Sequence, residues 1–466
     1  MESFYLKDLV KAVNGKFLIG DLKAPITSIS IDSRTVKKGE VFFALKGANF
    51  NGHDFIVSAI EKGASIIVYS DENAVFPNNS IHFPALIKVE DTLEALGALA
   101  KAYRAKFNNI KVFAITGSNG KTTTKEMLAS ILNVRGKTLS NKGNFNNRIG
   151  LPLSVFNLSS EYKNAVFELG TSIKGEIAAL ADIVRPDAAV ITNIGYSHLE
   201  TFINPDGVFE EKKVLFDFVN DNGFIVLNID DERLKTLEGK IQKKVITVST
   251  QSSAEVYADS ISVHEDIQRF YLHHGQDRIF VNIPAKGRFN ISNALSAAAC
   301  AIGAGCNLEE IQKGLENVKL PAMRMDSVVL DSGETLVNDA YNANPSSVRN
   351  SISAICESYP KKEVTLVLGD MLELGDKSAD YHREIGEFLN TKKLNAVYLI
   401  GDMSSEIQKT SVKNKTYHFK DPDELATALN KHARGEKSVF LFKGSRGMKL
   451  ETIYQKFREA LEKRKE

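Results

Sequence analysis

The sequence predicts an α/β protein of three domains, and three observations lead to that prediction. The chain has 466 residues, a length typical of about three domains. Apolar runs typical of buried strands alternate with helical stretches along most of the sequence. The alternation starts again after Pro321, which indicates a second doubly wound unit beyond that residue. We therefore expect domains at residues 1–107, 108–320 and 321–466.

Each expected domain contains its own strand runs and helical stretches. In the first domain, strands are expected at 40–45 and 64–70, and a helix at 90–107. In the central domain, strands are expected at 112–116, 164–170, 187–195, 224–230 and 244–250, with a helix at 290–306. In the third domain, strands are expected at 335–341, 363–370, 396–402 and 438–445. A mainly parallel sheet with helices on both faces fits the second and third of these patterns.

Composition and charge exclude several classes of partner. The formal net charge is +1, so no global field attracts nucleic acid or an anionic membrane. No apolar run approaches the ~20 residues that span a bilayer, and the opening MESFYLKDLVKAV has no apolar signal-peptide core. The cysteines Cys300, Cys306 and Cys356 lack metal-ligand or redox spacing, and we expect the first two to be buried in an alanine-rich helix. These features predict a cytoplasmic protein without nucleic-acid partners or stable membrane insertion.

The strongest chemical signal is the segment TGSNGKTTT at 116–124, between a buried strand and a helix. Such a turn points backbone N–H groups outward, and the helix N-terminus adds positive potential. Gly117 and Gly120 allow close approach of phosphate oxygens. Lys121 can reach the β- and γ-phosphates of a nucleotide, and the Thr122 hydroxyl can bind Mg²⁺.

The segment matches a shortened phosphate-loop pattern, because Ile115 occupies the position of the first glycine in G-x-x-x-x-G-K-[ST]. The alternative is a lysine-bearing turn that binds no nucleotide. A lysine and three hydroxyl groups at the start of one helix favour ATP binding. The predicted nucleotide-binding residues of the loop are Gly117, Ser118, Asn119, Gly120, Lys121, Thr122 and Thr123.

Further chemistry is expected at the strand ends beside this loop. Glu168 ends an apolar strand run, and His198 follows the next one. The carboxyl ends of parallel strands line the ligand crevice in this architecture, so both side chains are expected at the same edge as the phosphate loop. Lys212 and Lys213 are expected at a helix start, where the pair by itself indicates a charged helix face.

Taken together, these residues resemble the muramyl ligase family. The motifs that carry the resemblance are TGSNGKTT, NKGNFNNRIGLP, FELGTS, NIGYSHLETF and EKKVLF, in the order found in the family. The motifs NDAYNANPSS, LGDMLELG and FKGSRGMK resemble one member in particular, and SIDSRTVKKGEVFFALKGANFNGHDF resembles its UDP-sugar-binding domain. The resemblance covers essentially the whole chain.

The resemblance implies a small α/β UDP-sugar-binding domain, a central P-loop parallel-sheet ATPase domain and a C-terminal Rossmann-like α/β domain. It implies a ligase that uses ATP to join D-alanyl-D-alanine to UDP-N-acetylmuramoyl-tripeptide in cytoplasmic peptidoglycan synthesis. The tripeptide carboxylate would attack the γ-phosphate to give an acyl phosphate, which the dipeptide amine would then attack. The third residue of the peptide, diaminopimelate or lysine, stays open, and the chain is expected to be a monomer.

The resemblance also assigns catalytic and metal-binding roles. It implies that Lys121 contacts the β- and γ-phosphates and that Thr122 and Glu168 hold one Mg²⁺. Glu168, His198 and a carbamylated Lys212 would hold a second Mg²⁺. An unmodified lysine would repel the ion, whereas a carbamate supplies the oxygen ligands that Mg²⁺ prefers.

Other positions are carried over from the family to the nucleotide and sugar sites. They are Asn290 and Asn293 at the adenine, Arg324 and Asp339 from the third domain over the nucleotide, and Ser33 and Arg34 at the UDP sugar. The chain departs from the family pattern at Phe289, where histidine is usual, and at Asn51, where aspartate is usual.

Two alternative functions remain open from the sequence. The first is another ligase on the same scaffold, such as folylpolyglutamate synthetase or a muramyl ligase that adds a single amino acid. DAYNANPSS and the first-domain pattern argue against it. The second is a binding protein that uses ATP only to close its domains. The combination of Glu168, His198 and Lys212 disfavours this reading, because binding alone does not need a second metal.

Overall fold

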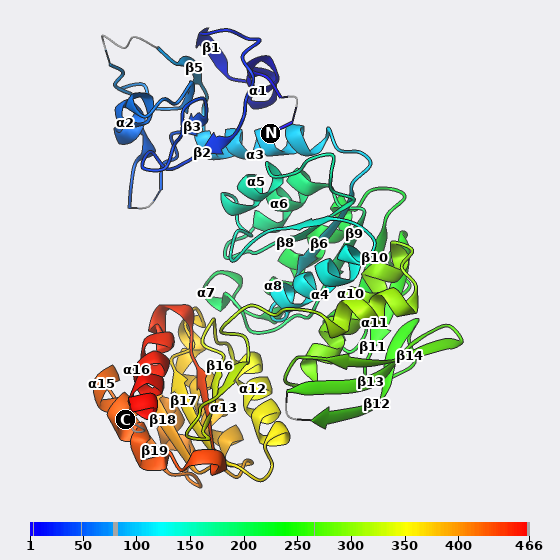
Figure 1. Cartoon of the computed structure of the whole chain (residues 1–466), viewed down its shortest axis with the longest axis vertical. Coiled ribbons are helices and arrows are strands. Elements are labelled where there is room, and N and C mark those ends of the chain that lie inside the picture. Colours follow the sequence, from blue (N-terminus) through cyan, green and yellow to red (C-terminus); the bar gives the residue numbers. More distant parts are fainter. Residues whose placement is uncertain (3, 48, 78–82, 265, 464–466) are drawn as a thin grey trace.

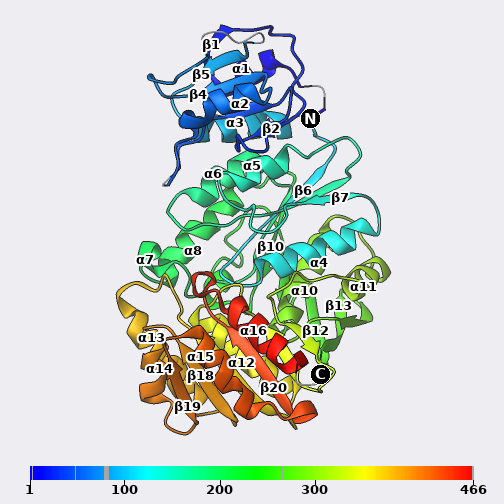
Figure 2. The same cartoon turned by 60° about the vertical axis from the view of Figure 1, so that its left-hand side comes forward.

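The computed structural model describes residues 1–2, 4–47, 49–77, 83–264 and 266–463. Within these residues the strands form three sheets, which follow one another along the length of the molecule (Figure 1). Figure 2 shows the first sheet and its helices at one end, the central sheet in the middle and the third sheet at the other end. This arrangement confirms the predicted α/β fold with three units.

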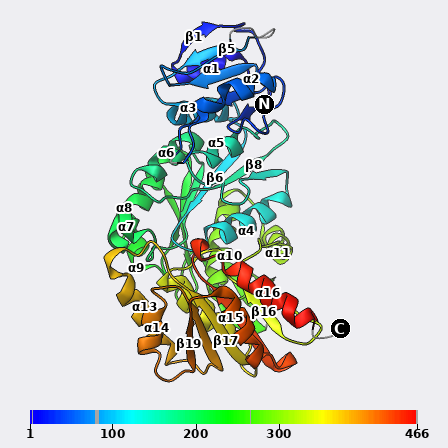
Figure 3. The ribbon, with the colours of Figure 1, turned by 90° about the vertical axis from the view of Figure 1, so that its left-hand side faces the viewer.

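The first sheet is small and has the strand order β1-β5-β4-β3-β2. Its strands are β1 (Lys16–Ile19), β2 (Ile29–Ser30), β3 (Val41–Phe43), β4 (Ile66–Tyr69) and β5 (Ala85–Lys88), and its helices are α1 (Leu6–Val13), α2 (Ile56–Glu61) and α3 (Thr92–Arg104). Helix α3 connects this unit to the central one, because the Lys101 amine lies 2.7 Å from an Asp182 oxygen. The Tyr103 hydroxyl also donates to the Leu158 carbonyl at 2.8 Å. Figure 3 shows α3 lying above α5 and α6 at this junction.

The central sheet has the order β14-β13-β12-β11-β10-β9-β6-β8-β7. Its strands are β6 (Lys111–Thr116), β7 (Thr138–Ser140), β8 (Asn164–Glu168), β9 (Ala188–Ile191), β10 (Phe224–Asn228), β11 (Lys244–Ser249), β12 (Val256–His264), β13 (Ile267–His274) and β14 (Asp277–Ile283). Its helices are α4 (Lys121–Asn133), α5 (Gly150–Val155), α6 (Glu176–Val184), α7 (Leu199–Phe202), α8 (Pro205–Lys213), α9 (Glu232–Lys235), α10 (Phe289–Gly303) and α11 (Leu308–Glu316). Strands β7 to β12 pair in parallel, as expected, whereas β12 to β14 form antiparallel pairs that the sequence analysis did not predict.

The central strand β6 is buried on both faces, which explains its continuous apolar sequence. Val112 and Ala114 belong to the core on one side of the sheet. Phe113 and Ile115 belong to the core on the other side. The strand is therefore held rigidly where it enters the glycine-containing loop.

The third sheet has the order β15-β16-β20-β17-β18-β19 and is parallel except for β15. Its strands are β15 (Asp326–Val329), β16 (Thr335–Asn338), β17 (Glu363–Gly369), β18 (Ala396–Ile400), β19 (Thr416–Phe419) and β20 (Ser438–Lys443). Its helices are α12 (Pro345–Ser358), α13 (Ser378–Leu389), α14 (Ser405–Thr410), α15 (Pro422–Leu429) and α16 (Leu450–Glu462). Parallel strands separated by helices confirm the predicted second doubly wound unit.

Two local predictions need correction. Lys212 and Lys213 lie in the last turn of α8 and not at a helix start, because the helix already begins at Pro205 after its cap residue Asn204. A proline in the first turn is favourable there, since its missing N–H needs no partner. Cys306 lies just beyond the end of α10, although both it and Cys300 are buried as predicted.

Among the residues that the structure describes, every helix is too short or too polar to span a bilayer.

Candidate functional site

A cavity of about 400 Å³ lies between the central and third units. Its central-unit lining comprises Ser118, Asn119, Gly120, Lys121, Thr122, Thr123, Asn144, Asn146, Asn147, Glu168, Gly170, Thr171, Ser172, Glu176, His198, Phe289, Asn290 and Asn293. Its third-unit lining comprises Arg324, Met325, Asp339, Tyr341, Asn342, Asn344, Ser347, Asn350, Ser351 and Lys443. The structure therefore brings most of the predicted site residues to one cavity, with polar side chains from both units.

The two loop glycines are required by close packing as well as by backbone conformation. Gly117 has φ +146°, and a Cβ there would lie 1.9 Å from the Thr192 hydroxyl oxygen. Gly120 has φ +80°, and a Cβ there would lie 2.2 Å from the Asn293 amide oxygen. Any side chain would push the loop away from β9 and α10. The loop is therefore packed tightly between the end of β9 and helix α10.

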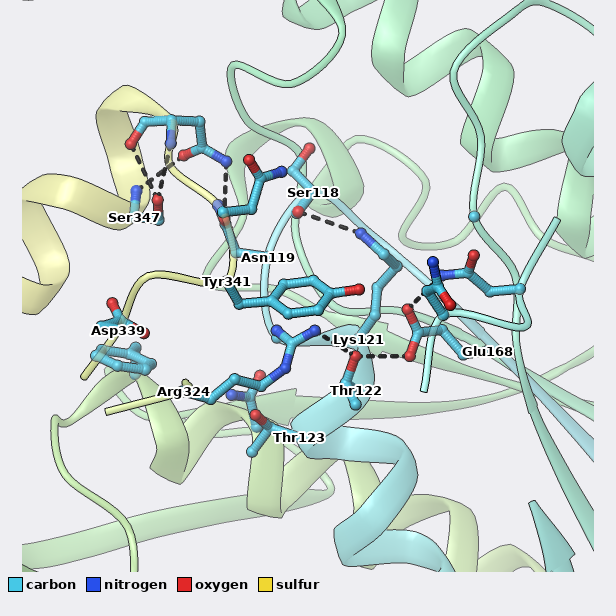
Figure 4. Close-up of a pocket in the computed structure, with 18 of the residues that line it drawn as sticks. Ser118, Asn119, Lys121, Thr122, Thr123, Glu168, Arg324, Asp339, Tyr341 and Ser347 are labelled. Atoms are coloured by element: carbon cyan, nitrogen blue, oxygen red, sulfur yellow. Dashed lines mark hydrogen bonds between the residues drawn. The ribbon is translucent and has the colours of Figure 1, made fainter. Parts of the chain in front are cut away.

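The Lys121 amine curls back over the loop that carries it (Figure 4). It donates to the Gly117 carbonyl at 2.7 Å and to the Ser118 carbonyl at 3.3 Å. Burial lowers the pKa of Lys121, the Glu168 carboxylate acts in the opposite direction, and the Arg324 cation lowers it further. The amine is hydrogen-bonded to carbonyl oxygens, and a phosphate group in the cavity would give it a directly bound anion.

Glu168 and Thr122 meet directly at the bottom of the cavity (Figure 4). The Thr122 hydroxyl donates to Glu168 Oε2 at 2.7 Å, and the Asn146 amide donates to Glu168 Oε1 at 2.8 Å. Asn141 holds the backbone of Glu168, accepting from its N–H at 2.9 Å and donating to its carbonyl at 3.0 Å. Both carboxylate oxygens are therefore oriented, with one facing the start of α4.

The third unit contributes a cation directly above α4. The Arg324 guanidinium donates to the Thr122 hydroxyl at 2.8 Å and lies 4.1 Å from the centre of the Tyr341 ring. Figure 4 shows the Tyr341 ring over this guanidinium. The Asn344 amide donates to Asn119 Oδ1 at 2.8 Å, so a second bond joins the third unit to the phosphate loop.

Asp339 lies at the end of β16 and is held by several donors. The Lys443 amine is 2.6 Å from Asp339 Oδ2, and the Ser351 hydroxyl donates to the same oxygen at 2.6 Å. The Met325 N–H donates to Oδ1 at 3.1 Å. The buried carboxylate is therefore compensated by a charge and by hydrogen bonds, as burial of an anion requires.

Asn290 and Asn293 lie in the first turns of α10, as the sequence predicted. The Asn290 amide donates to the Lys286 carbonyl at 2.7 Å, and the Asn293 amide donates to Asn290 Oδ1 at 2.8 Å. Both line the main cavity, and a smaller cavity of about 230 Å³ adjoins Asn293. It is lined by Asn119, Gly120, Asn193, Ile194, Gly195, Asn228, Asp230, Asp231, Phe289, Ser292, Asn293, Ser346 and Asn350.

His198 and Lys212 occupy different environments. His198 lines the main cavity, and its Nδ1 lies 2.6 Å from a Glu373 oxygen of the third unit. Lys212 is 1% exposed. Burial lowers the pKa of Lys212 well below its ordinary value, and the nearby Lys121 cation lowers it further, against the carboxylates of Glu211 and Glu168.

The predicted sugar-site residues lie in the first unit, away from this cavity. Ser33 is buried, whereas the Arg34 side chain is 86% exposed and pairs with Asp32 at 2.7 Å. The hydrogen bonds from Arg34 hold the pKa of Asp32 at about 2. The structure therefore places these two residues together but does not join them to the phosphate loop.

Several residues at the cavity were not singled out from the sequence. They are the lining residues Asn146, Tyr341, Asn344 and Lys443 and the adjacent Asn141 and Glu373. All six lie inside motifs that were recognised as segments, namely NKGNFNN, NDAYNAN, LGDMLELG and FKGS. A segment match does not indicate which of its side chains faces the cavity, because that depends on contacts between units.

Comparison with known families assigns this architecture to a class of ligase. Residues 25–104 match the model described as Mur ligase family, catalytic domain, and residues 115–301 match the Mur ligase middle domain. Residues 323–446 match the Mur ligase, glutamate ligase domain. The chain belongs to the Mur ligase family.

Individual relatives cover nearly the whole chain. A Bacillus subtilis protein named UDP-N-acetylmuramoyl-tripeptide--D-alanyl-D-alanine ligase is 36% identical over 434 residues, covering 92% of each chain. A crystal structure of MurF from Acinetobacter baumannii superposes with a TM-score of 0.90 at 31% identity, covering 98% of this chain and 99% of that one. MurF from Thermotoga maritima in complex with ADP gives a TM-score of 0.84 at 29% identity, covering 94% and 98%.

Proposed function

We propose that the chain is an ATP-dependent ligase that joins D-alanyl-D-alanine to UDP-N-acetylmuramoyl-tripeptide in peptidoglycan precursor synthesis. The observation that carries the proposal is the cavity between the central and third units, where a phosphate loop faces the NDAYNANPSS segment. Relatives that match over more than nine-tenths of the chain bear the name of this ligase. Their names favour the proposal over single-amino-acid muramyl ligases and folylpolyglutamate synthetase.

The nucleotide is expected to lie along the phosphate loop. The N-terminus of α4 and the Lys121 amine would bind the β- and γ-phosphates, because both present positive potential to the cavity. Arg324 would move from the Thr122 hydroxyl to a phosphate oxygen, to which a guanidinium binds strongly. Asn290 and Asn293 would contact the adenine base. Asp339 would contact the part of the nucleotide that lies nearer the third unit.

The reaction would proceed by two displacements. An oxygen of the tripeptide's terminal carboxylate attacks the γ-phosphorus of ATP, the bond to the bridging oxygen breaks, and ADP leaves. The dipeptide amine then attacks the carbonyl carbon of the acyl phosphate, forming the amide and releasing phosphate and a proton. Charge concentrates on phosphoryl oxygens in both steps, so Lys121 and Arg324 stabilise them electrostatically. Contacts of the third unit with the loop exclude water from the acyl phosphate.

The oxygen donors at the start of α4 suit Mg²⁺. Thr122 and Glu168 place a hydroxyl and a carboxylate together, which are ligands of the type that Mg²⁺ prefers. The ion would neutralise phosphate charge when bound with ATP. Among the described residues, no group of three or more His, Cys, Asp and Glu side chains is placed to hold a metal ion. Mg²⁺ commonly keeps several water ligands and shares phosphate oxygens with its substrate, so the remaining ligands would come from these groups or from a modified side chain.

Carbamylation of Lys212 is part of the proposal. The side chain is buried next to Glu211 and close enough to Glu168 to feel its charge. Burial favours the neutral form of an amine, and the neutral amine is the form that reacts with CO₂. The resulting carbamate would carry oxygen ligands toward Glu168 and His198. Lys213 next to it is partly exposed and pairs with Glu210 at 2.7 Å, as expected for an ordinary surface cation.

The remaining features of the proposal concern the whole chain. We assign residues 1–107 to the UDP-sugar-binding domain, with Ser33 and Arg34 at the sugar nucleotide, residues 108–320 to the ATP-binding domain and residues 321–466 to the C-terminal domain. The three sheets of the described residues lie within these limits, which supports the division. We also propose a cytoplasmic monomer, and the free thiols of Cys300, Cys306 and Cys356 are compatible with a reducing compartment.

The proposed function is tested by assaying the purified chain with ATP, Mg²⁺ and UDP-muramoyl-tripeptides that end in diaminopimelate or lysine. Each tripeptide is combined with D-Ala-D-Ala, a single amino acid or no amine, and ADP release and peptide products are measured. We expect an amide product with D-Ala-D-Ala and at least one tripeptide. Product with a single amino acid alone would favour the other muramyl ligases. ADP release in the absence of both the tripeptide and the amine would favour an ATP-gated binding protein.

A further inference from the structure

The loop after β17 brings a carboxylate of the third unit to a cavity-lining histidine of the central unit. Glu373 Oε2 lies 2.6 Å from Nδ1 of His198. Glu373 itself is absent from the cavity lining, whereas His198 is part of it. The carboxylate therefore contacts one ring nitrogen of a cavity-lining histidine without lining the cavity itself.

This contact belongs to a larger fit between α7 and the same loop. The Glu200 N–H donates to the Glu373 carbonyl at 3.3 Å. Nearby, the rings of Tyr196 and Tyr381 meet edge to face at 5.1 Å. Figures 2 and 3 show α7 facing the third unit on the side of α13. The contact between His198 and Glu373 is therefore supported by a main-chain bond and an aromatic contact between the same two units.

Both His198 and Glu373 have left-handed backbone conformations, which residues other than glycine rarely adopt. His198 has φ 54° and Glu373 has φ 62°. Residues with a Cβ persist in this region where the surrounding structure holds them there. Each backbone thus directs its side chain toward the other unit.

We propose that Glu373 is a positioning residue that orients the His198 imidazole when the third unit closes. When a neutral imidazole donates Nδ1–H to Glu373, its lone pair lies on the other ring nitrogen, Nε2, which is then available to the cavity. Metal-binding histidines are commonly oriented by a carboxylate on their second nitrogen, which fixes the tautomer and the ring plane. The role of His198 as a Mg²⁺ ligand rests on the proposed function. Because Glu373 belongs to the third unit, it can orient His198 only when the third unit is closed against the central one.

Kinetics of variants test the proposal. Glu373→Ala should lower kcat roughly 10- to 100-fold, the range for removal of such a partner, while the KM values for tripeptide and dipeptide change little. Glu373→Gln should recover most of kcat, because its amide oxygen still accepts from Nδ1–H. Asp376→Ala, which removes an exposed carboxylate from the same loop, is the matched control and should behave like the wild type.

A double-mutant cycle separates positioning from a general structural effect. If Glu373 acts through His198, adding Glu373→Ala to His198→Ala should cause no further loss of kcat. A kcat for Glu373→Ala within about twofold of the wild type would overturn the proposal, as would equal losses in both backgrounds.

Nitrogen NMR of histidine-labelled protein gives a measurement that does not need turnover. The ¹⁵N signals of His198, assigned with His198→Gln, are recorded with a non-hydrolysable ATP analogue and the UDP-tripeptide. We expect the proton on Nδ1 in the wild type and in Glu373→Gln, and a shift toward Nε2–H in Glu373→Ala. Identical His198 signals in wild type and Glu373→Ala would contradict the proposal. Failure of the proposed function appears separately, as a wild-type chain that forms no amide.

Discussion

At the scale of single residues, Lys121 offers the most direct test of the phosphate loop. Its amine is held by carbonyls of its own loop, so removing it should leave the surrounding fold intact. We expect Lys121→Ala to lower kcat/KM by at least about 100-fold, because a cation at the developing phosphoryl charge is lost. Steady-state kinetics and thermal melting of the same preparation check this. Near-normal turnover by folded Lys121→Ala protein would show that ATP reacts elsewhere.

The adjacent lysines at the end of α8 provide an internal comparison. Lys212 is 1% exposed, whereas Lys213 is partly exposed, because neighbouring residues on a helix point about 100° apart. If Lys212 carries a carbamate, Lys212→Ala should nearly abolish activity, short carboxylic acids should restore part of it, and Lys213→Ala should be mild. Bicarbonate should reactivate decarbamylated enzyme. Substantial activity of Lys212→Arg would contradict the modification, since a guanidinium forms no carbamate.

At the scale of elements, His382 ties α13 to the loop that carries Glu373. It is fully buried; its Nε2 accepts from the Met371 N–H at 3.0 Å, and its Nδ1 contacts the Ser378 carbonyl at 2.7 Å. Burial lowers the pKa of His382 from its ordinary value of 6.5. As pH falls, the unfolded chain therefore takes up the proton first, near pH 6.5, and the folded chain does so only at lower pH.

The stabilisation by neutral His382 is thus complete above about pH 6.5 and decreases as pH falls below it. The slope should not exceed about 1.4 kcal/mol per pH unit. His382→Gln can keep an acceptor for Met371 but does not titrate, so its melting temperature should fall less than that of the wild type between pH 7 and pH 5.5. Melting curves of both proteins across this range test the expectation. Parallel pH dependences would assign the effect to other groups.

At the scale of the whole molecule, polar contacts join the third unit to the central one in several places. Asn344 donates to Asn119, and Arg324 donates to Thr122, at the cavity itself. These groups also face the proposed nucleotide, so ligands should favour the closed arrangement. Small-angle scattering should show a smaller radius of gyration with ATP analogue plus UDP-tripeptide than without ligands. Lys121→Ala should require more nucleotide for the same compaction, and an unchanged radius in the wild type would contradict ligand-driven closure.

The sequence by itself determined the features that depend on neighbouring residues. The apolar run before Gly117 predicted a buried strand, and β6 lies there with both faces covered. Glycines, a lysine and hydroxyl groups predicted a phosphate loop because backbone conformation and helix-end potential are local properties. The restart of strand runs beyond Pro321 similarly predicted the third sheet.

Tertiary structure decided which distant groups meet. The antiparallel strands β12 to β14 extend the central sheet, and the sequence analysis did not predict them, although Phe270 and Leu272 show the alternate burial of a strand. The bond between Asn119 and Asn344 joins residues 225 positions apart. The pairing of His198 with Glu373 depends on two left-handed backbones in different units. Such contacts arise from the way whole sheets pack, and short-range patterns along the chain carry no information about that packing.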